Sequence, residues 1–349
     1  MLRPLLFWRE KEVPAVTIKD LSAQTGYSVG TVSRVLNNQP NVSEKAKKAI
    51  LEAAEASGFQ LNVNAKQLKQ SHSNAVLVVV KGMSNELFSG MVETIQACMA
   101  ETSYQLMVDY IDETGNEVLR ALQLCRERKP LGILFLGGNR EHFQQDFRRI
   151  GVPCVLVTND AAGLGFQNLS SVSSDDVLAG KVAIEQLVAM GHRKIAVIGG
   201  DLETSDISNL RYQGCMEAFQ AHGIPFDPVQ DYEGIRYSFE EGYRAAKRLL
   251  ARNKQFSAIF AASDVMAIGA IRALRDAGLR VPEDVSVMGF DGLDVGRYTV
   301  PTLSSIRQNG AAMARRSVEM LLENLRSGGL PRYETVPFDV NIRESIRKN

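Results

Sequence analysis

From Asn74 onward, short apolar runs alternate with amphipathic stretches, and this alternation is the feature that most constrains the fold of the chain. Near-continuous apolar runs are typical of parallel strands that are buried on both faces of a sheet. The stretches between the runs repeat their apolar residues with the period of an α-helix. The strand-like runs lie at residues 75–80, 104–109, 132–136, 154–157, 195–199, 257–262 and 285–290, and the helical stretches at 87–101, 175–190, 212–222, 239–252 and 264–277. This pattern predicts an α/β fold with doubly wound parallel sheets.

The length of this α/β segment predicts two lobes. It runs over residues 73–349, and a single hydrophobic core rarely grows beyond about 250–300 residues. We expect a first lobe at about residues 73–172 and 302–332, and a second lobe at about residues 173–301 and 333–349. Ligands bind to parallel sheets at the carboxyl ends of the strands. A cleft between the lobes would therefore bring two sets of strand ends face to face.

Three short helices are expected before residue 60. Thr17 begins a capping-box-like sequence, and Gly26 is a typical residue at a helix C-terminus. Ser28 and Ser43 stand where their hydroxyls can cap a second and a third helix. Short helices with a tight turn between the first two predict an N-terminal all-α helix-turn-helix domain at residues 17–60.

Charge is distributed unevenly along the chain, although the totals cancel. Residues 1–70 carry ten Lys and Arg against six Asp and Glu, a net charge of +4, and the remainder carries thirty against thirty-four, a net charge of −4. A basic head on an acidic body favours nucleic-acid binding at one end. Residues 1–16 show no periodicity and are expected to be a tail, and residues 61–72 are expected to be a linker or hinge.

Cysteine and histidine usage argues against a disulfide scaffold or a zinc site. The four cysteines include no C-x-x-C, and the four histidines show no paired spacing. No apolar run approaches the roughly 20 residues that a membrane-spanning helix needs. The apolar residues 5–8 form a patch too short for a signal peptide. We therefore expect a cytoplasmic protein without a cofactor, a metal or a membrane segment.

The second helix of a helix-turn-helix places its first turn in the major groove of DNA. Arg34 is suited to a bidentate contact with guanine, and Val29 to a contact with the thymine methyl group. Short hydroxyls in the same turn are suited to phosphates. Taken singly, Ser28 could only cap the helix and Thr31 could only pack. The candidates for DNA binding are Thr17, Ser28, Val29, Gly30, Thr31, Ser33, Arg34 and Asn37.

The string T-I-K-D-L-S-A-Q-T-G-Y-S-V-G-T-V-S-R-V-L-N at residues 17–37 strongly resembles the head of the lactose/galactose repressor (LacI/GalR) family. The resemblance continues with G-F-Q-L-N-V-N-A-K-Q-L-K at residues 58–69 and implies a hinge helix that folds on operator DNA. Leu68 matches the leucine that wedges into the minor groove, although alone it could be a helix-packing leucine. Lys66 and Lys69 would then meet phosphates.

The rest of the chain resembles the same family, which implies an effector domain that looks like a periplasmic sugar-binding protein with a cleft between two lobes. Arg211 in N-L-R-Y-Q-G-C matches an arginine that binds sugar hydroxyls or a carboxylate. Asp291 in V-M-G-F-D-G matches an acid that grips the ligand. Tyr237 and Phe88 match aromatic residues of the two lobes. The implied effector-binding residues are Phe88, Asn159, Arg211, Tyr237, Ser263, Asp264 and Asp291.

Each of these residues also has a structural interpretation. Asp264 could simply cap a helix, Arg211 could be a surface charge, and Asp291 could belong to a turn. Ser263 stands where family members usually carry Asn, and Asn159 lies where they often carry other polar residues. These departures fall on positions that help to select the ligand, so its identity stays open.

Motifs of enzymes are missing: the sequence contains no G-x-S-x-G, no G-x-x-x-x-G-K-[ST] and no G-x-G-x-x-G after a strand. We therefore expect a transcriptional repressor that binds a near-palindromic operator as a homodimer and responds to a small, sugar-like molecule. The alternative is a small-molecule binding protein with a vestigial DNA-binding head. An enzyme that uses the cleft is the third possibility.

Overall fold

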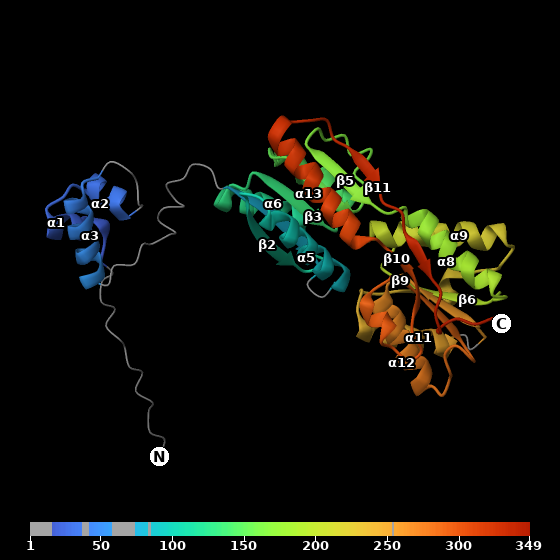
Figure 1. Ribbon diagram of the computed structural model, residues 1–349. Coiled ribbons are helices and arrows are strands. Elements are labelled where there is room, and N and C mark those ends of the chain that lie inside the picture. Colours follow the sequence, from blue (N-terminus) through green and yellow to red (C-terminus); the bar gives the residue numbers. More distant parts are fainter. Residues whose placement is uncertain (1–15, 37–41, 58–73, 83–84, 253–254) are drawn as a thin grey trace, which may run out of the picture. The chain divides into compact units, whose positions relative to one another are not determined.

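The computed structural model describes residues 16–36, 42–57, 74–82, 85–252 and 255–349. The chain divides into two compact units, Met1–Ser71 and His72–Asn349, which are described separately below (Figure 1).

The described residues of the first unit form the three predicted helices, α1 (Ile18–Thr25), α2 (Val29–Leu36) and α3 (Glu44–Ala56). The predicted capping box is present, because Thr17 and Asp20 exchange hydrogen bonds at the start of α1. Gly26 ends α1 with a left-handed backbone at φ 73°, and Ser43 caps α3. The three helices share a small core of Leu21, Val32, Val35, Ala46, Ile50 and Ala54.

The second unit contains two six-stranded sheets, and the first is parallel throughout, with the strand order β11-β5-β4-β3-β1-β2. Helices α5 (Glu86–Ala100) and α13 (Gly310–Ser327) cover one of its faces, and α6 (Glu117–Arg128), α7 (Arg140–Asp146) and the 3-10 turn η1 (Phe147–Arg149) cover the other (Figure 1). We call this sheet with its helices the first lobe. Its strands are β1 (Ala75–Lys81), β2 (Gln105–Ile111), β3 (Gly132–Leu136), β4 (Cys154–Thr158), β5 (Leu169–Ser173) and β11 (Tyr333–Thr335).

The second sheet has the order β12-β10-β9-β8-β6-β7 and is parallel except for β12, which runs antiparallel to β10. Helices α8 (Asp176–Ala189) and α9 (Asp206–Ala221) cover one face, and α11 (Phe239–Arg252) and α12 (Asp264–Asp276) the other. We call this the second lobe. Its other elements are β6 (Ile195–Gly199), β7 (Tyr232–Gly234), β8 (Ala258–Ala261), β9 (Ser286–Asp291), β10 (Ser304–Arg307), β12 (Asp339–Asn341), α10 (Pro228–Asp231) and η2 (Asp294–Arg297).

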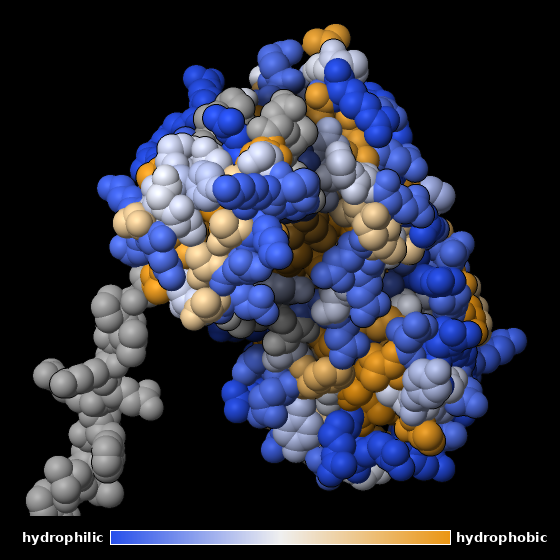
Figure 2. All heavy atoms as spheres, turned by 60° about the vertical axis from the view of Figure 1, so that its left-hand side comes forward, coloured by the Kyte–Doolittle hydropathy of each residue, from blue (hydrophilic) through white to orange (hydrophobic). Residues whose placement is uncertain are grey.

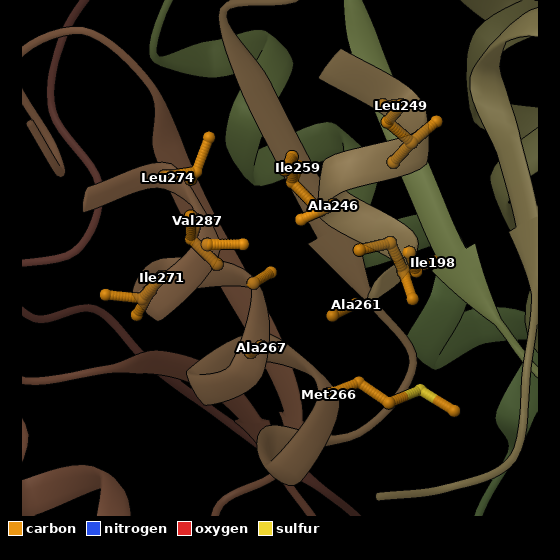
Figure 3. Close-up of a cluster of buried hydrophobic side chains, with 14 of the residues drawn as sticks. Ile198, Ala246, Leu249, Ile259, Ala261, Met266, Ala267, Ile271, Leu274 and Val287 are labelled. Atoms are coloured by element: carbon orange, nitrogen blue, oxygen red, sulfur yellow. The ribbon is translucent and has the colours of Figure 1, made fainter. Parts of the chain in front are cut away.

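The core of the second lobe shows why the apolar runs become buried strands. Figure 3 shows Ala246 and Leu249 of α11 beside Ile198 and Ile259 of the sheet. Helices α11 and α12 pack together on this face of the sheet. Alternate residues such as Val197 face α8 and α9 on the other side. Because both faces of each strand are covered, the strands carry continuous apolar runs.

The fold class and the seven predicted strands are confirmed, but the limits of the lobes are corrected. Strand β10, expected in the first lobe as part of residues 302–332, pairs with β9 of the second. Strand β11, expected in the second lobe as part of residues 333–349, pairs with β5 of the first. These strands have four and three residues, too few for an apolar pattern to specify a sheet.

Hydrophilic residues predominate on the face of the molecule in Figure 2, with smaller groups of hydrophobic side chains between them. Within the described ranges, no helix is both long and apolar enough to cross a membrane.

The helix pairs of the second lobe cross at glycines. A Cβ atom at Gly214 of α9 would overlap the carbonyl oxygen of Val177 in α8, and one at Gly180 of α8 would overlap the carbonyl oxygen of Arg211 in α9. Gly242 and Gly269 make the corresponding approach between α11 and α12. The two backbones can lie this close only because these residues lack side chains.

We predict that Gly214→Ala lowers the free energy of unfolding by about 3 kcal/mol, because the added methyl group meets backbone that cannot move aside cheaply. Gly90→Ala is the matched control, since a Cβ atom there meets nothing within 4 Å. That helical substitution is expected to be neutral or stabilising by about 0.5–1 kcal/mol. Chemical denaturation of both variants measures the difference, and equal stabilities would contradict the close crossing.

Candidate functional site

A buried arginine lies at the carboxyl ends of the strands of the second sheet. Arg211 of α9 is only 5% exposed. Its Nε donates to Oδ1 of Asp176 at 2.8 Å, and its Nη1 donates to the carbonyl oxygen of Ala262 at 2.6 Å. The guanidinium carbon lies 3.6 Å from the centre of the Phe290 ring. The structure therefore excludes the surface-charge interpretation of Arg211.

Two carboxylates keep this buried guanidinium charged. Burial lowers the pKa of Arg211, but Asp176, through its charge and its hydrogen bond, raises that pKa together with Tyr237 and Asp291, and the net shift is upward. Within the described part of the chain, Nη2 of Arg211 donates to no protein group. A buried donor without a protein partner is expected where a ligand supplies the acceptor.

Asp291 is held in an unusual conformation beside Arg211. It is the last residue of β9, and its φ of 106° lies in a region that side chains other than glycine rarely adopt. Its Oδ1 lies 3.9 Å from Nη1 of Arg211 and accepts a hydrogen bond from Nε2 of Gln308 at 2.8 Å. Burial raises the pKa of Asp291 to about 6, against the lowering effects of Arg211 and of hydrogen bonds from Gln308 and Ser263. Strained backbone of this kind is concentrated at binding sites.

Tyr237 belongs to the same cluster. Its hydroxyl lies 2.8 Å from Oγ of Ser208, one turn before Arg211 on α9. Burial raises the pKa of the Tyr237 phenol, which therefore remains protonated at neutral pH. The structure thus brings together four of the predicted residues, namely Arg211, Tyr237, Ser263 and Asp291.

Asp264 lies next to the cluster but is occupied by the protein itself. Its Oδ1 accepts a hydrogen bond from the Ser305 hydroxyl at 2.6 Å, and its Oδ2 accepts one from the backbone N–H of Leu293 at 2.6 Å. These contacts tie the start of α12 to the turn after β9. Asp264 therefore braces this turn, and both its oxygens have protein partners.

Phe88 and Asn159 lie in the first lobe. Phe88 belongs to α5 and is packed in the core of the first lobe, with Gly137 against its ring. Asn159 is buried and donates from Nδ2 to the carbonyl oxygen of Gly138 at 3.0 Å. It follows Thr158, which has a φ of 78° at the end of β4, as Asp291 has a positive φ at the end of β9. Among the described residues, no hydrogen bond or ion pair links Phe88 or Asn159 directly to the Arg211 cluster.

Hydrogen bonds and ion pairs join the first lobe to the second lobe. Nδ2 of Asn139 donates to the carbonyl oxygen of Thr204 at 3.1 Å, and the backbone N–H of Arg140 donates to Oδ2 of Asp206 at 2.6 Å. Arg236, next to Tyr237, pairs with Asp112 and Glu113 of the first lobe.

The cluster has the chemistry of a binding site for hydroxyl groups. Arg211 offers hydrogen-bond donors, and Asp176 and Asp291 offer carboxylate oxygens in a mostly apolar surrounding. Across the ranges that the structure describes, no group of three or more His, Cys, Asp and Glu side chains is arranged to hold a metal ion.

Residues Asp176, Ser208 and Gln308 were missed by sequence reasoning. Asp176 is the second of two aspartates at the start of α8, where either could have been the helix cap. Gln308 follows β10, a strand that its short polar sequence did not reveal. Only the fold places these residues beside Arg211.

The first turn of α2 is accessible, as DNA contact requires. Ser28, Val29, Gly30 and Arg34 are exposed, whereas Thr31 and Ser33 are half-buried. The hydroxyls of Ser28 and Thr31 lie 3.0 Å apart, and Thr17 is exposed in its capping box. Asn37, Lys66, Leu68 and Lys69 lie outside the described residues.

Comparison with known proteins gives matches over both units. Residues 17–62 match the family described as bacterial regulatory proteins, lacI family, and residues 184–346 match a periplasmic binding protein-like domain. The HTH-type transcriptional regulator MalR of Clostridium butyricum is 32% identical over 95% of this chain and 99% of its own length.

Solved structures are similar over most of the chain as well. A complex of the transcriptional regulator CelR with cellobiose is 28% identical, with a TM-score of 0.71, over 95% of this chain and 99% of that chain. The Lac repressor dimer bound to operator and an anti-inducer has the same fold, with a TM-score of 0.72 at 23% identity, over 95% and 99% of the two chains.

We predict that the free energy of unfolding of the Asp291→Asn variant increases, relative to that of the unchanged protein, as the pH rises from about 4 to about 7. The folded pKa of Asp291 is about 6, above its ordinary value of 3.8, so the folded state holds this proton more tightly than the unfolded state. The contribution of Asp291 is therefore complete below about pH 4 and is lost as the pH passes 6, whereas Asn cannot ionise. The change amounts to about 3 kcal/mol at most.

Urea denaturation of both proteins at pH 4, 5, 6 and 7 measures this difference in the free energy of unfolding. A difference that is constant with pH would show that Asp291 has an ordinary pKa.

Proposed function

The chain belongs to the LacI family of bacterial transcriptional regulators, and we propose that it is a repressor whose affinity for operator DNA is controlled by a small molecule held between its lobes. The proteins of this family are regulators rather than enzymes. The observation that carries the effector part of the proposal is the buried Arg211, whose Nη1 lies 3.9 Å from Oδ1 of the strained residue Asp291 and whose Nη2 has no protein acceptor among the described residues. Packing alone would require neither the strained backbone of Asp291 nor buried donors of Arg211 that lack a protein acceptor.

We propose that the exposed side chains of α2 bind DNA. Arg34 and Val29 are exposed side chains on this helix and would contact base edges, while Ser28 and Thr31 would contact phosphates. Since the partner is DNA, we propose a cytoplasmic location. The proposed hinge contacts of Leu68, Lys66 and Lys69 extend this interface.

We propose that the repressor acts as a homodimer. Two copies related by a two-fold axis would present two α2 helices to a near-palindromic operator. Apolar side chains of the second lobe support this proposal. Phe239 is 41% exposed, and Tyr298 and Val300 are 82% and 76% exposed, so a second copy of the chain would have apolar surface to cover there.

The charges of the cluster favour a neutral effector rich in hydroxyl groups. The carboxyl groups of Asp176 and Asp291 both lie beside the single guanidinium of Arg211, so acidic groups outnumber basic ones in the site. An anionic group on the effector, such as a phosphate or a carboxylate, would be repelled by these two side chains. A hydroxyl group on the effector can instead accept a hydrogen bond from Nη2 of Arg211 and donate one to a carboxylate. The CelR complex with cellobiose is a relative with a ligand of this kind.

Effector control follows from a two-state equilibrium between arrangements of the lobes. A ligand shifts this equilibrium only by its difference in affinity for the two states. A change in the position of the first lobe would alter the spacing of the two DNA-binding heads in the dimer. By linkage, operator DNA would change the affinity for the effector by the same factor.

We predict that Arg34→Ala weakens binding to the operator about tenfold to a hundredfold and weakens binding to random DNA much less, because a lost base contact costs about 1–3 kcal/mol of discrimination. The operator is first selected from a pool of random double-stranded sequences with the full chain. Fluorescence anisotropy at fixed salt then measures both affinities. Arg149→Ala, which removes an exposed arginine of the first lobe, is the control for net charge. Equal losses on both DNAs would remove Arg34 from base recognition.

We predict that neutral sugars raise the melting temperature of the protein more than anionic ones, because the cluster repels added negative charge. The panel is cellobiose, glucose and ribose against glucuronate and glucose 6-phosphate. Asp291→Asn should abolish the shift, whereas Asp109→Asn, which breaks an ion pair of the first lobe, should preserve it. A larger shift with the anions would contradict the neutral effector, and no shift with any compound would contradict a sugar site.

A further inference from the structure

A second buried charge lies in the first lobe, outside the cluster described above. Glu117, the first residue of α6, is 0% exposed. Its Oε2 accepts from Nζ of Lys81 at 2.6 Å and lies 3.0 Å from Nδ1 of His142. Its Oε1 accepts from the backbone N–H of Asn139 at 2.7 Å. One carboxylate therefore connects the end of β1 and the starts of α6 and α7.

Stability alone is a weak reason for such an arrangement. Burying a carboxylate and an ammonium costs several kcal/mol of solvation, and well-packed apolar side chains often replace a buried pair at no loss. A fully satisfied buried network does, however, hold its members in one geometry. The member of interest here is the backbone N–H of Asn139, because it belongs to the loop between β3 and α7.

This loop contacts both effector candidates of the first lobe. A Cβ atom at Gly137 would lie 3.1 Å from the ring of Phe88, and the carbonyl oxygen of Gly138 accepts the hydrogen bond from Asn159. Gly138 also packs so closely on Phe143 that a Cβ atom there would lie 2.8 Å from its ring. The loop thus has little freedom to move without Phe88 and Asn159.

The same loop reaches across to the second lobe. Asn139 bonds to the carbonyl oxygen of Thr204, and the backbone N–H of Arg140 bonds to Asp206, the first residue of α9. Helix α9 also carries Ser208 and Arg211. A continuous series of hydrogen bonds therefore runs from Glu117 through the loop to the helix that holds the proposed effector site.

We propose that Glu117 is a positioning residue for the effector site: its buried carboxylate holds the loop of residues 137–140 in the place where this loop ties the first lobe to the start of α9. The proposal rests on the proposed function for the meaning of the site. Its test needs neither effector nor DNA, so the two can fail separately.

The test is hydrogen–deuterium exchange of the full chain followed by mass spectrometry. Glu117→Gln keeps the shape of the side chain but removes the charge that binds Lys81. We expect exchange to rise about tenfold or more at residues 138–143 of the first lobe and also at residues 204–210 of the second lobe, because charge-assisted hydrogen bonds are lost. A rise confined to residues 138–143 would overturn the proposal.

Asp109→Asn is the matched control. It breaks the ion pair between Asp109 and Arg120, which also joins α6 to a neighbouring strand. In the part of the chain that the structure describes, neither side chain has a hydrogen bond or ion pair with the second lobe. Melting temperatures of both variants are measured alongside exchange. If Asp109→Asn raises exchange at residues 204–210 as much as Glu117→Gln does, the effect is general destabilisation and the proposal fails.

Asp206→Ala keeps the proposal testable if Glu117→Gln does not fold. It removes the acceptor for the Arg140 N–H, together with the acidic side chain in the first turn of α9, at the half-buried start of that helix. We expect it to raise exchange at residues 138–143 across the lobe boundary, and unchanged exchange there would overturn the proposal. In the double variant, Glu117→Gln should add little further exchange at residues 204–210, since both changes break the same series of contacts. Fully additive effects would also overturn it.

Discussion

The buried guanidinium of Arg211 is the group on which the second lobe depends. A charge that is only 5% exposed must be paired, and its partners come from three separate elements: Asp176 of α8, the carbonyl oxygen after β8 and the Phe290 ring of β9. Asp176 is within reach because α8 and α9 cross at Gly180 and Gly214. The close crossing of α8 and α9 at these two glycines and the ion pair of Asp176 with Arg211 therefore belong to the same helix contact.

The first lobe also holds a buried charge, of the opposite sign. The buried carboxylate of Glu117 lies at the start of α6 and accepts a hydrogen bond from Lys81 at the carboxyl end of β1. Each lobe also holds a non-glycine residue with positive φ at a strand end, Thr158 and Asp291. Strain and buried charge cost stability, and they are concentrated here at the edges where parallel sheets bind ligands. The hydrogen bonds from the loop of residues 137–140 to α9 connect the two edges.

The sequence predicted the strongly periodic helices and strands correctly, but it did not predict the short strands. The seven apolar strands and the three helices of the head appeared because burial on both faces, or on one helical face, demands a visible pattern. Strand β5, with the sequence L-S-S-V-S, was missed because its serines are buried through hydrogen bonds rather than through apolar packing. Strands β10 and β11 were expected in the wrong lobes because backbone pairing alone decides their sheet.

The sequence by itself determined the fold class, the helix-turn-helix and the family, because hydrophobic periodicity, helix caps and the string from Thr17 to residue 37 are local features. It also indicated Arg211, Tyr237, Ser263 and Asp291 as one group, through resemblance. Only the tertiary structure decided which charges meet. Asp176 lies 35 residues from Arg211 along the chain, and Gln308 lies 17 residues from Asp291. Contacts over such separations depend on strand order and helix crossing, which no local pattern encodes. For the same reason, only the structure showed that Asp264 braces a turn and that Glu117 holds a loop.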